Sequence, residues 1–394
     1  MELKPSLSLI LPLIAFAVYS QAGYLWKLVS RVDIDKARLV RWENSTALNN
    51  QDCQVIHAAD ACEDVKIHYP SQTAFLGCGN PIERTHWYPC AGVRTVERRA
   101  ESSFREQLFK HDLRTGQTTA LELVGMEGDL ITHGIDILPV PEEPSKVHVF
   151  AVNHARDGDS IAIFVHELGS NVLRLVKNVK HPNIKTANGV VATGPLSFFI
   201  TNDHYSRKGP VRMLEEKYGP FTWSSNVQHC DARGEEVFCK KVGGAFPNAN
   251  GINLWQDKLF VGDSSNGTLT IFQVQEDKTL TNLKVVDVGA GADNINILPT
   301  TGDPIVAVFP TLENLPAYRD NVRTLGKEFL VPAAALRLDH TKDYAPELIY
   351  FDDGSVISFM TGVAADPVNG WLLVSSVLQY GGFAVCKVPP HAFA

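Results

Sequence analysis

Short polar clusters return along this chain once in roughly every 40–70 residues, and most stand beside a run of residues that favours a β-strand. They are Glu63-Asp64, His133-Gly134-Ile135, Asn188-Gly189, Asn250-Gly251-Ile252 and Asp293-Asn294. Asn and Asp are poor strand formers, so their regular return at strand edges indicates a repeated supersecondary unit. Repeats around an axis would bring these oxygens together, and carboxylate and amide oxygens are the ligands that Ca2+ prefers.

Beyond residue 50 the chain alternates strand-like runs with turn signals such as Asp157-Gly158 and Asn369-Gly370. The clearest runs are 147–152, 160–165, 197–200, 258–261, 269–272 and 371–374. Helical periodicity is scarce; besides the N-terminal segment it is best at 102–110 and 211–218. About 340 residues divide into six or seven units of about 50 residues, which predicts an all-β propeller. An antiparallel sandwich is the alternative, but it does not explain the regular polar clusters.

The N-terminus has the features of a targeting segment. Lys4 precedes an apolar run from Leu7 to Val18, and the small residues Ser20 and Ala22 stand where a signal peptidase reads. We expect 1–22 to be a signal peptide or an uncleaved signal anchor, 23–49 an extension and 50–394 one domain. Both outcomes place the chain in the secretory pathway, secreted or membrane-anchored. A retained apolar segment could hold it at a membrane or lipid surface.

The seven cysteines agree with export, because disulfides persist in oxidising compartments. A turn signal separates Cys230 from Cys239, which favours a local bond between them. Cys78 and Cys90 bracket a loop and could form a second local bond.

Cys53 and Cys386 lie at the two ends of the globular part, where a bond would fasten the ends of a ring. An odd number of cysteines leaves at least one free thiol, for which Cys62 is the candidate. Asn44 and Asn266 begin N-glycosylation acceptor sequences, which also fits export.

The formal net charge is −8, and no dense run of Lys and Arg with interleaved aromatic residues is present, so we expect no nucleic-acid partner. The chain has no Gly-x-Ser-x-Gly elbow and no His-Glu-x-x-His motif. A serine esterase and a zinc protease therefore have no support in the sequence.

Several segments carry a family resemblance through their order and spacing. They are Cys62-Glu63-Asp64-Val65, Thr132-His133-Gly134-Ile135, Val152-Asn153-His154, Asn188, Thr201-Asn202-Asp203-His204-Tyr205, Ala249-Asn250-Gly251-Ile252-Asn253, Asp293-Asn294-Ile295 and Cys386. In these segments, over roughly residues 50–390, the chain resembles the paraoxonase/arylesterase family of calcium-dependent, six-bladed propeller lactonases. The resemblance implies a hydrolase that opens lactones or cleaves aryl esters.

The resemblance implies one catalytic Ca2+, with ligands at Glu63, Asn188, Asn250, Asp293 and Asn294. Two carboxylates and three neutral amides would balance the charge of the ion and leave it able to polarise a carbonyl group.

His133 and His154 match the histidine pair of the family. A neutral imidazole can take a proton from water near pH 7, and a second imidazole can orient or relay. We therefore predict His133 as base or proton shuttle with His154 as its partner, and His204 as a structural residue.

The chain departs from the family pattern at the second, structural calcium. Asp64 and the carbonyl group of Ile135 match two of its ligands, but Gly189 stands where the family has Asp. The loss of an anionic ligand should weaken or abolish this ion. Segments 77–105 and 312–344 are longer than the family pattern, and we expect such loops to shape the mouth of the propeller.

Two other readings remain open from the sequence. One is a non-catalytic propeller that serves as a secreted or membrane-tethered scaffold. The other is a related enzyme, gluconolactonase-like or strictosidine-synthase-like. The complete set of five ligand positions argues against the first, and the histidine pair argues against a strictosidine-synthase-like enzyme.

Overall fold

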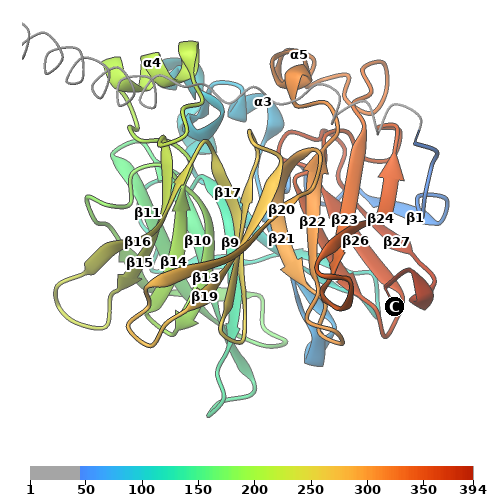
Figure 1. Ribbon diagram of the computed structural model, residues 1–394, viewed down its shortest axis with the longest axis horizontal. Helices are drawn as coiled ribbons and strands as arrows, with labels where there is room; N and C mark the ends of the chain where they lie inside the picture. The colour runs from blue at the N-terminus through green and yellow to red at the C-terminus, as the bar shows by residue number, and fades with distance from the viewer. Residues whose placement is uncertain (1–44, 394) are drawn as a thin grey trace, which may run out of the picture.

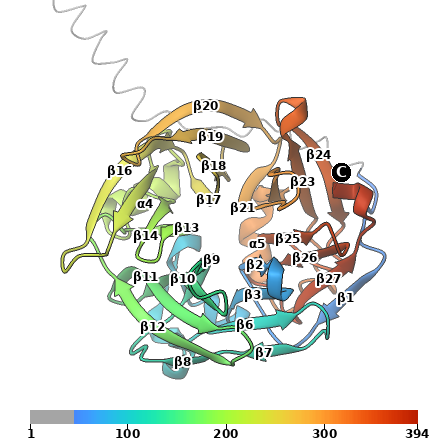
Figure 2. The ribbon, with the colours of Figure 1, turned by 90° about the horizontal axis from the view of Figure 1, so that it is seen from below.

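A computed structural model describes residues 45–393, which form six sheets arranged around one axis (Figures 1 and 2). The predicted all-β propeller is confirmed, and it has six blades. The leader predicted at 1–22 and the acceptor Asn44 lie outside the described residues. Within 45–393 no helix is long and apolar enough to cross a membrane.

The first three sheets follow one another along the chain, and their four main strands run in order from the innermost outward. Sheet 1 contains β2 (Asp64–His68), β3 (Thr73–Cys78), β6 (Gln107–Asp112) and β7 (Thr118–Ala120). Sheet 2 contains β9 (Thr132–Pro139), β10 (Lys146–Ala155), β11 (Gly158–Glu167) and β12 (Val172–Val179), with β8 (Glu122–Val124) at its outer edge. Sheet 3 contains β13 (Ala187–Gly194), β14 (Ser197–Asn202), β15 (Ser225–Asp231) and β16 (Phe238–Phe246).

The other three sheets complete the ring. Sheet 4 contains β17 (Ala249–Trp255), β18 (Lys258–Asp263), β19 (Thr268–Val274) and β20 (Leu280–Asp287). Sheet 5 contains β21 (Gly291–Ile297), β22 (Pro304–Phe309), β23 (Ala333–Asp339) and β24 (Ala345–Asp352). Sheet 6 contains β25 (Gly362–Asp366), β26 (Trp371–Ser375), β27 (Phe383–Lys387) and β1 (Cys53–Ile56).

One end of the ring carries the helices α3 (Pro81–Arg84), α4 (Pro210–Tyr218) and α5 (Leu315–Asp320) (Figure 1). The pair β4 (Trp87–Tyr88) and β5 (Val93–Arg94) follows α3 along the chain. The helix predicted at 211–218 is confirmed as part of α4. The helix predicted at 102–110 is wrong, because a 3-10 turn at Glu101–Phe104 is followed by β6, which pairs along its whole length with β3.

The apolar core is divided among the junctions of the ring. Each of six buried clusters joins two neighbouring sheets; for example, Phe150 of sheet 2 packs edge-to-face on Phe198 of sheet 3. Both faces of a blade are therefore buried, which explains strands such as β22 that are buried at every position. Sequence runs with little alternation are the expected consequence.

The ring closes through its chain ends. β1 pairs antiparallel with β27, with Cys53 opposite Cys386, and the two residues form the predicted disulfide. The predicted bond between Cys230 and Cys239 is also present, across β15 and β16.

The predicted bond between Cys78 and Cys90 is wrong. Cys78 bonds to Cys62, because the register that sets Asp64 opposite Gly77 also brings Cys62 beside Cys78. Cys90 is the free cysteine, in place of Cys62. Sequence separation alone did not reveal the strand register that decides this pairing.

Glycine allows the innermost strands to meet backbone to backbone. A Cβ atom at Gly251 would lie 2.3 Å from the carbonyl oxygen of Asp293, and one at Gly134 would lie 2.6 Å from that of Asn188. This close packing brings the polar ends of neighbouring strands to one level of the axis.

Candidate active site

The predicted ligands occupy equivalent places in four sheets. Glu63 comes directly before β2, Asn188 and Asn250 are the second residues of β13 and β17, and Asp293 is the third residue of β21. All four are buried and line one cavity of about 500 Å3 that also contains His133. The structure thus brings four of the five predicted ligand positions together in one cavity.

Four side-chain oxygens in this cavity are buried without a hydrogen-bond partner. They are Glu63 Oε2, Asn188 Oδ1, Asn250 Oδ1 and Asp293 Oδ1. A buried, unpaired polar atom is costly and rare, so four such atoms in one cavity indicate a missing partner. All four are hard oxygen donors, which fit Ca2+.

The amide nitrogens fix the direction of these oxygens. Asn250 Nδ2 donates to Ser264 Oγ at 2.7 Å, and Ser264 Oγ donates to the carbonyl oxygen of Ala292 at 2.8 Å. Asn294 acts on Glu63 instead, because its Nδ2 donates to Glu63 Oε1 at 2.7 Å. Asn294 is buried and does not line the cavity, and its role as a ligand stays a prediction.

The two carboxyl groups make the cavity electrostatically strained in the absence of a cation. Burial, together with the nearby charge of Asp64, raises the pKa of Glu63 to about 8. Burial and the charge of Glu63 raise the pKa of Asp293 well above its usual range. A divalent cation would neutralise both carboxylates and reverse these shifts.

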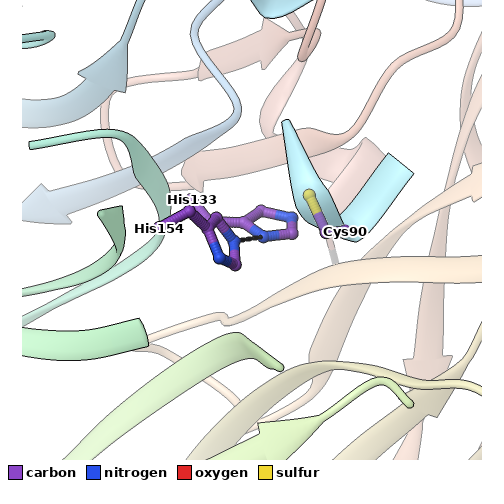
Figure 3. Close-up of side chains that lie close together, drawn as sticks. All are labelled: Cys90, His133 and His154. Carbon is purple, nitrogen blue, oxygen red and sulfur yellow. Dashed lines mark hydrogen bonds between the residues drawn. The ribbon is translucent and has the colours of Figure 1, made fainter. Parts of the chain in front are cut away.

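His133 on β9 and His154 on β10 form a hydrogen-bonded pair, with 2.9 Å between His133 Nδ1 and His154 Nε2 (Figure 3). His154 Nδ1 lies 3.2 Å from Asp159 Oδ2, a contact without hydrogen-bond alignment. His133 Nε2 lies 3.5 Å from Glu63 Oε1. The predicted pair therefore connects Asp159 to the cavity.

Burial, together with the charge of His154, lowers the pKa of His133 well below its ordinary value. His133 is therefore neutral at pH 7 and able to accept a proton.

Other residues hold Asp159 in place. Arg207 Nε donates to its Oδ1 at 3.0 Å, and the backbone N–H of Ala187 donates to its Oδ2 at 3.1 Å.

The sequence reasoning missed two residues that pack beside the histidine pair. The ring of Tyr88 contacts both imidazoles, tilted against His133 with a centroid distance of 5.3 Å and edge-to-face on His154 with one of 5.8 Å. Arg84 stacks on Tyr88 and donates to the backbone oxygen of Thr132, the residue before His133. Arg84 and Tyr88 belong to segment 77–105. The unusual length of this segment was the one sequence signal that it contributes to the site.

Cys90 was also missed as a site residue. It lines the cavity, and it lies with His133 and His154 so that one ligand atom from each falls within 4.8 Å of the others (Figure 3). Burial raises the pKa of its thiol well above the usual value, so the thiolate is disfavoured.

His204 also lines the cavity but points to Asp203, with 2.7 Å between its Nδ1 and Asp203 Oδ1. Burial alone would raise the pKa of Asp203, but His204 and Arg212 bring it down to about 2. This ion pair fits the structural role that was predicted for His204.

The cavity also has an apolar wall, to which the long segment 312–344 contributes two residues. It comprises Phe309, Leu312, Leu315, Phe359 and Leu378. Phe359 lies between Phe309 and Tyr318, with ring centroids 4.2 Å and 4.4 Å away. Stacking makes this wall a rigid apolar surface beside the polar floor.

The remaining predicted residues lie away from the cavity. Asp64 and Ile135 meet below it, where the backbone N–H of Ile135 donates to Asp64 Oδ2 at 3.0 Å. Asn266 is half-buried in the turn between β18 and β19, and its glycosylation stays a prediction.

Comparisons with known proteins agree with this geometry. A family model described as Arylesterase matches residues 45–381. Serum paraoxonase/arylesterase 2 from Rattus norvegicus is 32% identical over 254 residues, covering 62% of this chain and 68% of the relative. The protein of the same name from Canis lupus familiaris is 32% identical over 276 residues, covering 68% and 72%. Serum paraoxonase/lactonase 3 from Mus musculus is 27% identical over 324 residues, covering 80% and 84%.

Among solved structures, the regucalcin of Agrobacterium tumefaciens matches with a TM-score of 0.50 and 14% identity, over 87% of this chain and 96% of that chain. This likeness supports the propeller fold.

Proposed function

The chain belongs to the arylesterase family, and on that premise we propose that its central cavity is a calcium site for the hydrolysis of lactones and aryl esters. Family membership makes it a hydrolase of the esterase and lactonase type. The observation that carries the calcium site is the set of four unpaired, buried oxygens beside a neutral histidine.

The proposed ligands are Glu63, Asn188, Asn250 and Asp293, with Asn294 as a fifth ligand or as the residue that holds Glu63. When bound, Ca2+ supplies a Lewis acid that stabilises negative charge on the carbonyl oxygen of the substrate.

The histidine pair transfers the proton during hydrolysis. We place the proton of this hydrogen bond on His133 Nδ1, which donates it to His154 Nε2. The other ring nitrogen, His133 Nε2, then has a free lone pair that faces the cavity and can take a proton from water. The water oxygen then attacks the carbonyl carbon, and the C–O bond to the leaving oxygen breaks. His133 returns the proton to that oxygen, which gives an acid and an alcohol, or a hydroxy acid from a lactone.

Other residues position these groups and the substrate. His154 and Asp159 hold the ring of His133 and stabilise the positive charge that it gains. Tyr88 packs against both imidazoles and helps to fix their orientation. The apolar wall, which includes Phe309 and Phe359, would bind the ring or acyl part of the substrate.

Three disulfides and paraoxonase relatives are consistent with a protein of the secretory pathway. We propose that the chain is secreted or held at a membrane or lipid surface by its apolar N-terminal segment, and that it binds small-molecule esters rather than nucleic acid.

The test is hydrolysis of γ-lactones, δ-lactones and phenyl acetate by the purified full-length protein, with Ca2+ and with excess chelator. We expect turnover that the chelator abolishes and Ca2+ restores. Turnover that persists in chelator, with metal analysis finding no bound ion, would contradict the calcium site. Absence of turnover with one bound Ca2+ would contradict the proposed substrates alone.

A further inference from the structure

The residues at the second calcium position implied by the family do not fit an ion. Both carboxylate oxygens of Asp64 already accept backbone N–H groups, from Val65 at 2.8 Å and from Ile135 at 3.0 Å. Among the described residues, the unpaired carboxylate and Asn oxygens of the innermost strands all belong to the cavity above. The cavity therefore needs a cation to pair its oxygens, whereas the part of the axis around Asp64 does not.

The third ligand position is crowded. A Cβ atom at Gly189 would lie 2.9 Å from Ile252 Cγ2 and 3.0 Å from the carbonyl oxygen of Asn250. A carboxylate at this place would require the side chain of Ile252 and the neighbouring backbone of β17 to shift. Gly189 is thus part of the strand packing, and it is not a vacant ligand position.

Lys66 supplies a positive charge at this level. It stands two residues after Asp64 on β2, so both side chains point to the same face of the strand. It is only 4% exposed. Its Nζ donates to the carbonyl oxygen of Ile295 on β21 at 3.0 Å and lies 3.4 Å from Asp64 Oδ2.

The surroundings of Lys66 are those of a bound cation. The oxygen of Ile295 is also fixed by Asn253 Nδ2, which donates to it at 2.9 Å. Asp136 on β9 is a further buried carboxylate on which the charge of Lys66 acts. A Ca2+ ion added here would meet the ammonium group at close range and be repelled.

We propose that the ammonium group of Lys66 takes the place of the second calcium, as a cation that is covalently part of the chain. It neutralises Asp64 and joins β2 to β21 across the axis. The chain therefore binds one Ca2+ where the family pattern has two. The lower part of the axis is then stable at calcium concentrations that would leave a structural calcium site empty.

The experiment combines ion counting with thermal unfolding of the full-length protein. Metal analysis of the wild type in about 1 mM Ca2+ should give one ion per chain. Lys66→Met should lower the Tm in chelator by about 5 °C or more, because a buried carboxylate loses its partner. Ca2+ should raise the Tm of the variant only as much as it raises that of the wild type, because both carboxylate oxygens of Asp64 stay occupied by backbone N–H groups.

Lys177→Met is the matched control. Lys177 Nζ also donates to two backbone oxygens, those of Ala232 and Gly234, but it lies on β12, away from the axis. The Tm of Lys177→Met in chelator should stay closer to that of the wild type than the Tm of Lys66→Met does.

Two ions on the wild type would overturn the inference. A Lys66→Met protein with wild-type Tm in chelator would also overturn it, as would a Lys66→Met protein that binds one more Ca2+ than the wild type. No ion on the wild type would contradict the proposed catalytic site but agree with Lys66 as the cation of the axis. If Lys66→Met does not fold, the wild-type ion count decides alone.

Discussion

His133 and His154 share one hydrogen bond of 2.9 Å, although they stand on different strands of sheet 2 and 21 positions apart. The bond places His154 between the cavity and Asp159, so the three residues form a line that ends 3.5 Å from Glu63 Oε1. Each member of the line is predicted to contribute differently to hydrolysis.

Replacing His133 should remove the base and leave the cation site. We expect His133→Gln to lower kcat/KM for phenyl acetate by roughly 10²–10⁴-fold. Asp159→Asn, which acts through His154, should lower it only about tenfold and change the pH profile. Calcium affinity, measured by titration, should stay near the wild-type value in both variants. A larger loss in Asp159→Asn than in His133→Gln would contradict this order.

The pH dependence of hydrolysis should reveal the buried environment of His133. Its pKa is held well below the ordinary value by burial and by the charge of His154. The neutral ring is the active form, so activity should persist as the pH falls through 6.5, the ordinary value, and decline only at lower pH. The rate should be measured at calcium concentrations that no longer limit it at each pH. A midpoint at or above 6.5 would show that another group controls the rate.

The fold and the meeting of the polar clusters were predictable because both leave a local signal. Strands such as β18 and β19 appear as short apolar runs between turns, and Asn250 stands out as a poor strand former at a strand edge. Repetition then implies a common axis, as the cavity around Asn188 and Asp293 confirms.

The missed features depend on contacts between distant segments. The pairing of Cys62 with Cys78 follows from strand register, and β6 is a strand because it pairs with β3. Tyr88 meets the histidine pair only through the path of a long loop. Lys66 did leave a signal, a charged residue within the apolar run Val65-Lys66-Ile67, but its partner Ile295 is remote in sequence.

The proposed ligands can be tested against a residue of the same type outside the cavity. Asn250→Ala and Asp293→Ala should each weaken Ca2+ binding by roughly 100-fold or more and abolish calcium-dependent hydrolysis, while the circular dichroism spectrum stays native. Asn282→Ala is the control, because Asn282 is exposed on β20. Wild-type rates in either cavity variant would contradict the metal assignment.

Two of the three disulfides should differ in how much they stabilise the folded protein, because they close loops of very different length. Cys53 and Cys386 close a segment of 333 residues, whereas Cys230 and Cys239 close one of 9. Loop entropy predicts losses of about 6 kcal/mol and about 2.6 kcal/mol when each bond is removed by paired Cys→Ala changes. Denaturant unfolding measures both, and non-reducing digestion should recover Cys53 and Cys386 in one linked peptide pair. Equal losses in the free energy of unfolding would imply that other contacts already hold the ends of the ring together without the bond between Cys53 and Cys386.

Removal of calcium should make stability depend on pH in an unusual direction. Burial and the charge of Asp64 raise the pKa of Glu63 from 4.5 to about 8, so the folded, calcium-free protein holds this proton more tightly than the unfolded chain. The corresponding stabilisation is complete below pH 4.5 and is lost as the pH rises through about 8. In chelator the Tm should therefore fall by several degrees, about 5 °C, between pH 5 and pH 8.

With saturating Ca2+ the same change in pH should have the opposite or no effect, because the ion needs the ionised form of Glu63. Glu63→Gln in chelator is the matched variant: it keeps the shape of the side chain and cannot ionise, so its Tm should vary less with pH than that of the wild type. Asp293, whose pKa is raised well above its usual range by burial and by Glu63, should retain part of the effect. A wild-type Tm in chelator that rises between pH 5 and pH 8 would mean that other groups neutralise the cavity without a cation.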